Sequence, residues 1–242
     1  MVDAHCHIDL YPDPSGMARH VERSQIATVA VTNLPSAYLR AEPHVTSMKF
    51  LRLALGMHPL TTKEHRKERK CFAEIAKRSF YIGEVGLDFS PAGISTKDAQ
   101  VESFEFVLSS IKETGKFVTL HSRRAEAAVL EMVSQHLSYP VVFHWYSGSA
   151  STLNRILDAG HFFSINPAMT ISSNGQKIIK AIPPERMLTE TDGPFVKYDS
   201  RIVTPSDIAI TEEYLASIWT MERHAVSQKV NNNFKELLRT LR

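Results

Sequence analysis

The chain has 242 residues, of which 43% are hydrophobic and 22% are charged, as is usual for a globular protein. Its 28 Lys and Arg against 26 Asp and Glu give a net charge of +2, which argues against a nucleic-acid binder that relies on a broadly basic surface. Cys6 and Cys71 are too few for a disulfide framework. No apolar run approaches the ~18 residues of a membrane span, and no signal-peptide pattern opens the chain. We therefore expect one cytoplasmic domain over residues 1–242 that does not enter a membrane.

Eight short apolar segments alternate with polar turns and helical patterns. They cover residues 1–5, 26–32, 50–56, 80–84, 117–121, 141–144, 162–165 and 187–190. Several are rich in Val, Ile, Leu and Phe with little alternation, which is typical of strands covered on both faces. Helical patterns occupy residues 95–115, 123–136, 149–160 and 173–182, and two further helices are expected within about 205–242. The charged run at 63–70 is typical of the solvated face of a helix.

These alternations predict an α/β fold, a (β/α)8 TIM barrel forming a single domain. A doubly wound sheet usually has fewer strands and often a glycine-rich phosphate loop. Neither of the two common glycine-rich loop motifs occurs in this sequence. In a TIM barrel the active site lies at the C-terminal ends of the strands, so the residues at those ends are the candidates for function.

Histidines and carboxylates gather at the ends of the predicted strands. They are His5, His7, His58, Glu84, Asp88, His121, His144, Glu190 and Asp192. Because side chains alternate along a strand, His5 and His7 would both face the barrel mouth while Cys6 packs toward the helices. Burying so many ionisable groups without metals or ion pairs would be costly, which favours a metal site.

Taken singly, several of these residues have simpler interpretations. His58 would serve as a hydrogen-bonded structural histidine, and Glu84 would pair with an arginine. Asp192, which precedes Gly193 and Pro194, would initiate a turn. Metal binding is favoured over these simpler interpretations only if the side chains converge in space.

Six motifs resemble, in order and spacing, the TatD-family metal-dependent deoxyribonucleases of the amidohydrolase superfamily. They are "DAHCHID", "GMHP", "GEVGLD", "LHSR", "HWYSG" and "LTETDGP". The resemblance implies a barrel with two divalent cations (Mg, Mn or Zn) and hydrolysis of DNA, often by 3′→5′ exonuclease action on single strands. The overall similarity extends to the QatD branch of bacterial anti-phage operons. That branch would imply antiviral defence and protein partners from the same operon.

The resemblance also implies roles for individual residues. The first metal would be held by His5, His7, Glu84 and Asp192, and the second by Glu84, His121 and His144. Asp192 would orient a water molecule and act as general base. His58 would contact the substrate or assist proton movement, and Arg123 would bind a phosphate oxygen. Relatives that bridge their metals with a modified lysine are disfavoured, because the segment 117–121 has no lysine beside His121.

The loops at the predicted mouth depart from the family pattern. "FSPAGIST" lacks the usual cation, and Trp145 stands where a small residue is common. Trp145, Tyr146 and Phe89 offer stacking surfaces for unpaired bases, or else pack into the rim. Because such loops select the substrate, two alternatives remain open. One is a hydrolase of another ester or amide, and the other is a barrel subunit of a multiprotein defence complex.

Overall fold

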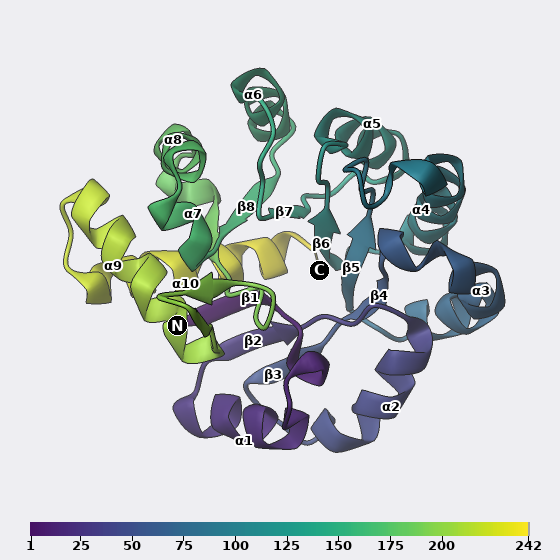
Figure 1. Ribbon diagram of the computed structural model, residues 1–242, viewed down its shortest axis with the longest axis horizontal. Coiled ribbons are helices and arrows are strands. Elements are labelled where there is room, and N and C mark those ends of the chain that lie inside the picture. Colours follow the sequence, from purple (N-terminus) through teal and green to yellow (C-terminus); the bar gives the residue numbers. More distant parts are fainter. Residues whose placement is uncertain (242) are drawn as a thin grey trace.

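Parallel strands occupy the centre of the computed structural model, and helices surround them (Figure 1). The structure describes residues 1–241. The central strands are β1 (Val2–Cys6), β2 (Ala27–Ala30), β3 (Leu51–Leu53), β4 (Leu55–Met57), β5 (Tyr81–Gly86), β6 (Phe117–His121), β7 (Val142–His144), β8 (Phe162–Ile165) and β9 (Met187–Thr189). The helices are α1 (Pro14–Ser24), α2 (Pro35–Val45), α3 (Thr62–Ala76), α4 (Lys97–Ile111), α5 (Glu126–His136), α6 (Ala150–Asp158), α7 (Pro167–Ile171), α8 (Ser173–Ala181), α9 (Ile208–Trp219) and α10 (Arg223–Thr240).

The strands form a barrel of eight positions, as the sequence predicts, but one position is divided. The sequence predicts one strand over 50–56, whereas the structure has β3 paired with β2 and β4 paired with β5. The division falls at Ala54, whose N–H donates to the carbonyl of Ala30 over 2.8 Å. The strands β3 and β4, on either side of Ala54, therefore lie in the same part of the barrel wall.

Gly56 allows the end of β2 to reach β5. A Cβ atom at Gly56 would lie 1.5 Å from the carbonyl oxygen of Thr32 and 2.9 Å from the backbone nitrogen of Glu84. Only glycine fits such a close approach. Thr32 thereby accepts the N–H of Glu84 at 3.1 Å, which fixes the strand that carries this carboxylate.

Hydrogen bonds between the ends of β9 and β1 close the barrel. The hydroxyl of Thr189 donates to the carbonyl of Val2 over 2.5 Å, and the N–H of Asp192 donates to the carbonyl of His5 over 2.9 Å. Helix α10 packs on both β9 and β1 at this junction. The first and last strands thus bring residues almost 190 positions apart to the same rim.

The core lies between the strands and the helices. Most strand residues are buried, as the nearly continuous apolar segments predict. Cys6 is fully buried in a cluster with Ala18 and Val21 of α1, which confirms that it packs toward the helices. Among residues 1–241, none of the helices combines the length and the apolar character needed to cross a bilayer.

Some elements differ from the sequence-based expectation. The helix predicted over 95–115 is shorter, because α4 begins after a 3-10 turn (Ile94–Thr96) and ends at Ile111. The alternation of strands and helices implies α1 and α2 without giving their bounds, and α7 is an addition to it. A short antiparallel hairpin, β10 (Lys197–Tyr198) with β11 (Arg201–Ile202), follows the last barrel strand. The run 63–70 lies on α3 and is mostly exposed, as expected.

Candidate metal centre

Glu84, at the end of β5, lies at the centre of the predicted site. Its Oε2 atom is 3.1 Å from Nε2 of His7 and 3.5 Å from Nε2 of His5, both at the end of β1. Nε2 of His58 also lies 3.5 Å from the same oxygen. Three imidazoles therefore face one oxygen of the carboxylate.

The second oxygen of Glu84 faces a different pair of histidines. Oε1 is 2.6 Å from Nδ1 of His121, at the end of β6, and 3.0 Å from Nε2 of His144, at the end of β7. The two oxygens of one carboxylate thus divide five histidines between them. This arrangement suits a carboxylate that bridges two positive centres.

Asp192 adds a second carboxylate after the end of β9. Its Oδ1 atom lies 3.6 Å from Nε2 of His7 and 3.7 Å from Nε2 of His5. The backbone of Asp192 has a φ of 48°, in the left-handed region that few non-glycine residues adopt. Its N–H is bonded to the carbonyl of His5, so the strained turn is held against β1.

A further layer of polar groups orients the histidines. Oδ2 of Asp88 lies 2.9 Å from Nε2 of His121, and Oγ1 of Thr119 lies 2.8 Å from Nδ1 of His5. Behind His144, Oε1 of Glu190 lies 3.4 Å from Nδ1, an ionic contact without a hydrogen bond. Partners of this kind fix the rotation of an imidazole, and therefore the direction of its free nitrogen.

Glu190 is itself held by several donors. Its Oε1 accepts the backbone N–H of Trp145 at 3.0 Å and the side-chain amide of Asn166 at 3.2 Å, and Oε2 accepts the hydroxyl of Ser164. In the same region, Asp3 accepts the N–H and the hydroxyl of Thr191 at 2.9 and 2.6 Å. These bonds tie the segment 190–192 to the neighbouring strands.

The charges of the central groups follow from their burial and their neighbours. Burial alone would raise the pKa of Glu84, but the imidazoles of His58 and His144 lower it well below its usual range. Burial raises the pKa of Asp192 to about 7, against the pull of His144 and His7. The two carboxylates therefore differ: Glu84 is held ionised, and Asp192 titrates near neutral pH.

Three groups of side chains have ligand atoms close enough to share an ion. They are His5, His144 and Asp192; His5, His7 and Glu84; and His58, Glu84 and His121. Within the described residues, Nε2 of His5 is a buried nitrogen without a hydrogen-bond partner. A buried lone pair surrounded by carboxylates and imidazoles fits a divalent cation, since imidazole and carboxylate are its common ligands.

The strand-end residues meet at one rim, as predicted. The three aromatic residues named as possible stacking surfaces differ in their exposure. Trp145 is 38% exposed, whereas Tyr146 is buried, with its hydroxyl bonded to the carbonyl of Ser149. Of the two alternatives left open, Tyr146 therefore packs into the rim and offers no stacking surface. Phe89 is half-buried beneath the ammonium of Lys97.

Arg123, the predicted phosphate-binding residue, lies exposed on the segment after β6. The sequence did not single out Thr119, Asp3 or Phe195, and it gave no role to Asp88 or Glu190. Phe195 follows the "TDGP" motif directly, and that adjacency was the available signal.

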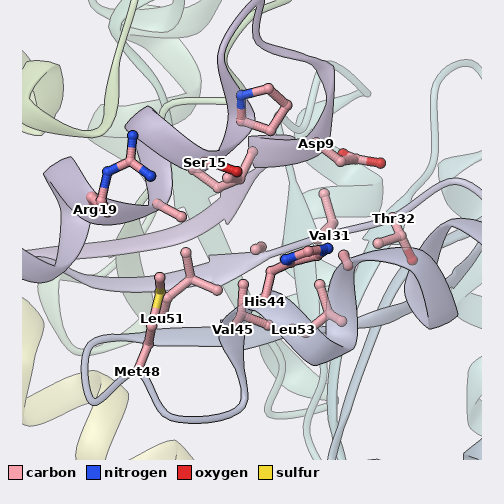
Figure 2. A pocket seen from close by; sticks show the side chains of 15 residues that line it. Asp9, Ser15, Arg19, Val31, Thr32, His44, Val45, Met48, Leu51 and Leu53 are labelled. Atoms are coloured by element: carbon pink, nitrogen blue, oxygen red, sulfur yellow. The ribbon is translucent and has the colours of Figure 1, made fainter.

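A separate cavity of about 330 Å³ lies between α1 and α2. Figure 2 shows Arg19 and Ser15 on one side of it and His44 on the other, and Leu51 is among its apolar lining residues. None of the residues grouped around Glu84 lines this cavity. It is therefore distinct from the metal centre.

Comparisons with known proteins agree with this geometry. Residues 2–239 match the family described as "TatD related DNase". The human protein named "Deoxyribonuclease TATDN3" is 25% identical over 262 residues, which cover 100% of this chain and 96% of the human protein. An uncharacterized metal-dependent hydrolase of Methanocaldococcus jannaschii is 26% identical, with 96% of this chain and 94% of that protein covered.

Solved structures show the same fold. The TatD homologue YjjV of Escherichia coli superposes with a TM-score of 0.88 at 22% identity, over 98% of this chain and 97% of that one. A TatD-family hydrolase of Entamoeba histolytica gives a TM-score of 0.80 at 18% identity, with 98% and 97% covered. With the family match running through nearly the whole barrel, the chain belongs to the TatD related DNase family.

Proposed function

We propose that this chain is a divalent-metal-dependent phosphodiester hydrolase that cleaves DNA. The observation that carries the proposal is the division of five histidines between the two oxygens of Glu84. The family match and the name of the human relative support DNA as the substrate.

Four of the five histidines keep this division among the proposed ligands, whereas His58, which also faces Oε2 of Glu84, is assigned to the substrate. One cation would be held by His5, His7, Glu84 and Asp192, and the other by Glu84, His121 and His144. When bound, two divalent cations supply positive charge that stabilises a phosphate and lowers the pKa of a coordinated water. Mg, Mn and Zn are all compatible with this mixture of nitrogen and oxygen donors.

Other residues of the chain would position the substrate and move protons. We propose that Asp192, whose Oδ1 lies beside Nε2 of His5 and of His7, orients the attacking water and accepts its proton. The side chains of His58 and His121 are 13% and 15% exposed, more than those of the other histidines around Glu84. The phosphate would therefore approach from the side of His58, with Arg123 contacting its oxygens.

We further propose that the substrate is single-stranded DNA, shortened from its 3′ end. The exposed Trp145 beside His144 supports the single-stranded substrate, because an aromatic side chain stacks on unpaired bases.

The test uses purified protein that has been freed of metal and then supplied with Mg, Mn or Zn. We expect cleavage of 5′- and 3′-labelled single-stranded DNA that EDTA and Asp192→Asn each abolish. Asp158→Asn, an exposed carboxylate at the end of α6, is the matched control and should cleave as the wild type does. Retained cleavage by clean Asp192→Asn protein would contradict the assignment. Hydrolysis of carboxylic esters without cleavage of DNA would contradict the nuclease proposal alone.

A further inference from the structure

Phe195 is an exposed aromatic side chain fixed beside the metal centre. Phe195 is 57% exposed. Its ring contacts the ring of His7 edge to face, with the centroids 5.0 Å apart and an interplanar angle of 88°. Its N–H donates to the carbonyl of Asp192 at 2.9 Å. Two proposed ligands therefore determine where this ring lies.

The other aromatic side chains near the mouth are less available. Tyr146 is buried, and the ring of Phe89 is covered by Lys97, whose ammonium lies 5.0 Å from the ring centroid. Trp145 and Phe195 remain as the exposed aromatic residues among the large apolar side chains of residues 1–241. Each follows a proposed ligand closely in the sequence, Trp145 after His144 and Phe195 after Asp192.

The exposure of Phe195 belongs to a wider pattern at this end of the barrel. A single exposed apolar residue needs no explanation. Here, however, most of the exposed large apolar side chains lie on segments that follow the C-terminal end of a strand. Besides the two aromatic residues, they include Leu10, Leu60, Ile94 and Ile171. The rim of the mouth therefore offers apolar surface to whatever enters it.

We propose that Phe195 stacks on the base of the nucleotide whose phosphate lies at the metal centre. This inference rests on the proposed function, and it places the base on the side of His7, which the ring of Phe195 contacts. A nucleotide with its phosphate near Glu84 extends its sugar and base outward, toward the rim. In a duplex each base is held by pairing with the opposite strand, whereas an unpaired end can turn its base toward Phe195. The substrate class is accordingly a strand end with an intact, unpaired base.

Stacking of this kind is independent of base identity and contributes about 5- to 150-fold in binding for each base. Phe195→Leu would remove the ring and keep an apolar side chain, and Phe195→Trp would keep an aromatic one. Met221→Leu, an exposed position between α9 and α10 away from the mouth, is the control.

The experiment measures binding and cleavage on two strands that differ only in the base of the terminal nucleotide, which is present in one and absent in the other. Binding uses phosphorothioate-linked versions of both strands with Mn²⁺, so that it does not depend on turnover. For the strand with its base, we expect Phe195→Leu to raise Kd and KM by about 5- to 150-fold with little change in kcat, and Phe195→Trp to restore both. For the abasic strand, wild type and Phe195→Leu should bind equally.

The outcomes separate the two proposals. Equal losses on both strands, no loss on either, or no binding by the wild type would overturn stacking by Phe195. Binding that depends on the base, without cleavage by any cation tested, would leave the stacking proposal standing and contradict the nuclease assignment. Comparing the Tm of Phe195→Leu with that of Met221→Leu identifies a folding defect. If Phe195→Leu has such a defect, the binding of Phe195→Trp to the two strands tests the stacking proposal instead.

Discussion

The imidazole ring of His5 stacks on that of His144, with the centroids 3.9 Å apart and the planes at 12°. Burial, and next the charge of His144, lower the pKa of His5. For His144, burial acts in the same direction, but the carboxylates of Glu190 and Glu84 outweigh it and raise the pKa well above its usual value. Two stacked, buried imidazoles cannot both carry charge cheaply, so in the metal-free protein the proton resides on His144.

This charge distribution predicts that cation binding releases protons. His121 lies between Glu84 and Asp88, and although burial opposes them, these carboxylates raise its pKa. A ligating imidazole must be unprotonated, so a cation has to displace the protons on His121 and His144. Affinity should fall as the pH is lowered, and the number of protons released should fall as the pH is raised past these pKa values. Calorimetry of Mn²⁺ binding in buffers with different ionisation enthalpies measures that number. A release near zero at pH 7, or one that grows with pH, would refute the assignment of these protons.

Removing the carboxylate behind His121 should weaken metal binding while leaving the proposed ligands in place. Although burial opposes it, hydrogen bonds from His121 and Ser90 lower the pKa of Asp88 to about 2, so Asp88 is an ionised acceptor. Loss of such a partner typically lowers metal affinity by about 10- to 100-fold. We expect this loss for Asp88→Ala and a smaller one for Asp88→Asn, which keeps an oxygen acceptor.

The measurement is a competition titration with a metal-binding dye. Asp98→Ala, which removes an exposed carboxylate in the first turn of α4, is the control and should bind metal as the wild type does. Equal affinities for Asp88→Ala and Asp98→Ala would show that Asp88 does not act through His121.

The barrel and its central residues were predictable because both depend on local signals. Apolar segments without alternation identify buried strands, and a polar residue directly after such a segment must lie at the rim. This reasoning placed His5, Glu84 and His144 together, although β1 and β7 are far apart along the chain. The same reasoning gave the correct direction for Cys6, because alternation along β1 is a local property.

The remaining features depend on contacts that no local pattern records. The division at Ala54 arises from its bond to Ala30 in another strand. Trp145 and Tyr146 are adjacent, yet one is exposed and the other buried, because the backbone after β7 leaves the strand conformation with a φ of 37° at Trp145. Likewise, the exposure of Phe195 follows from the turn at Asp192 rather than from its own residue type.

A last prediction concerns stability and a histidine at the opposite end of the strands. His161 precedes β8 and is 4% exposed, and its Nδ1 accepts the N–H of Val141 over 3.3 Å. Burial, and next the charge of Arg186, lower the pKa of His161 to about 4. In the unfolded chain the pKa returns to about 6.5, so the unfolded state binds more protons between these values. The neutral form therefore stabilises the fold fully above pH 6.5, and this contribution is lost as the pH falls toward 4, by on the order of 3 kcal/mol.

His161→Asn retains an oxygen that can accept the N–H of Val141 but cannot take up a proton in this range. We expect the free energy of unfolding of the metal-free variant, measured with urea between pH 4 and 6.5, to depend less steeply on pH than that of the wild type. His224→Asn, which replaces a histidine at an exposed position on α10, is the control and should keep the wild-type slope. If His161→Asn keeps the full wild-type slope, the acid sensitivity of the fold must come from other groups. The next to substitute is His65, which is buried against α4 and whose pKa burial also lowers to about 4.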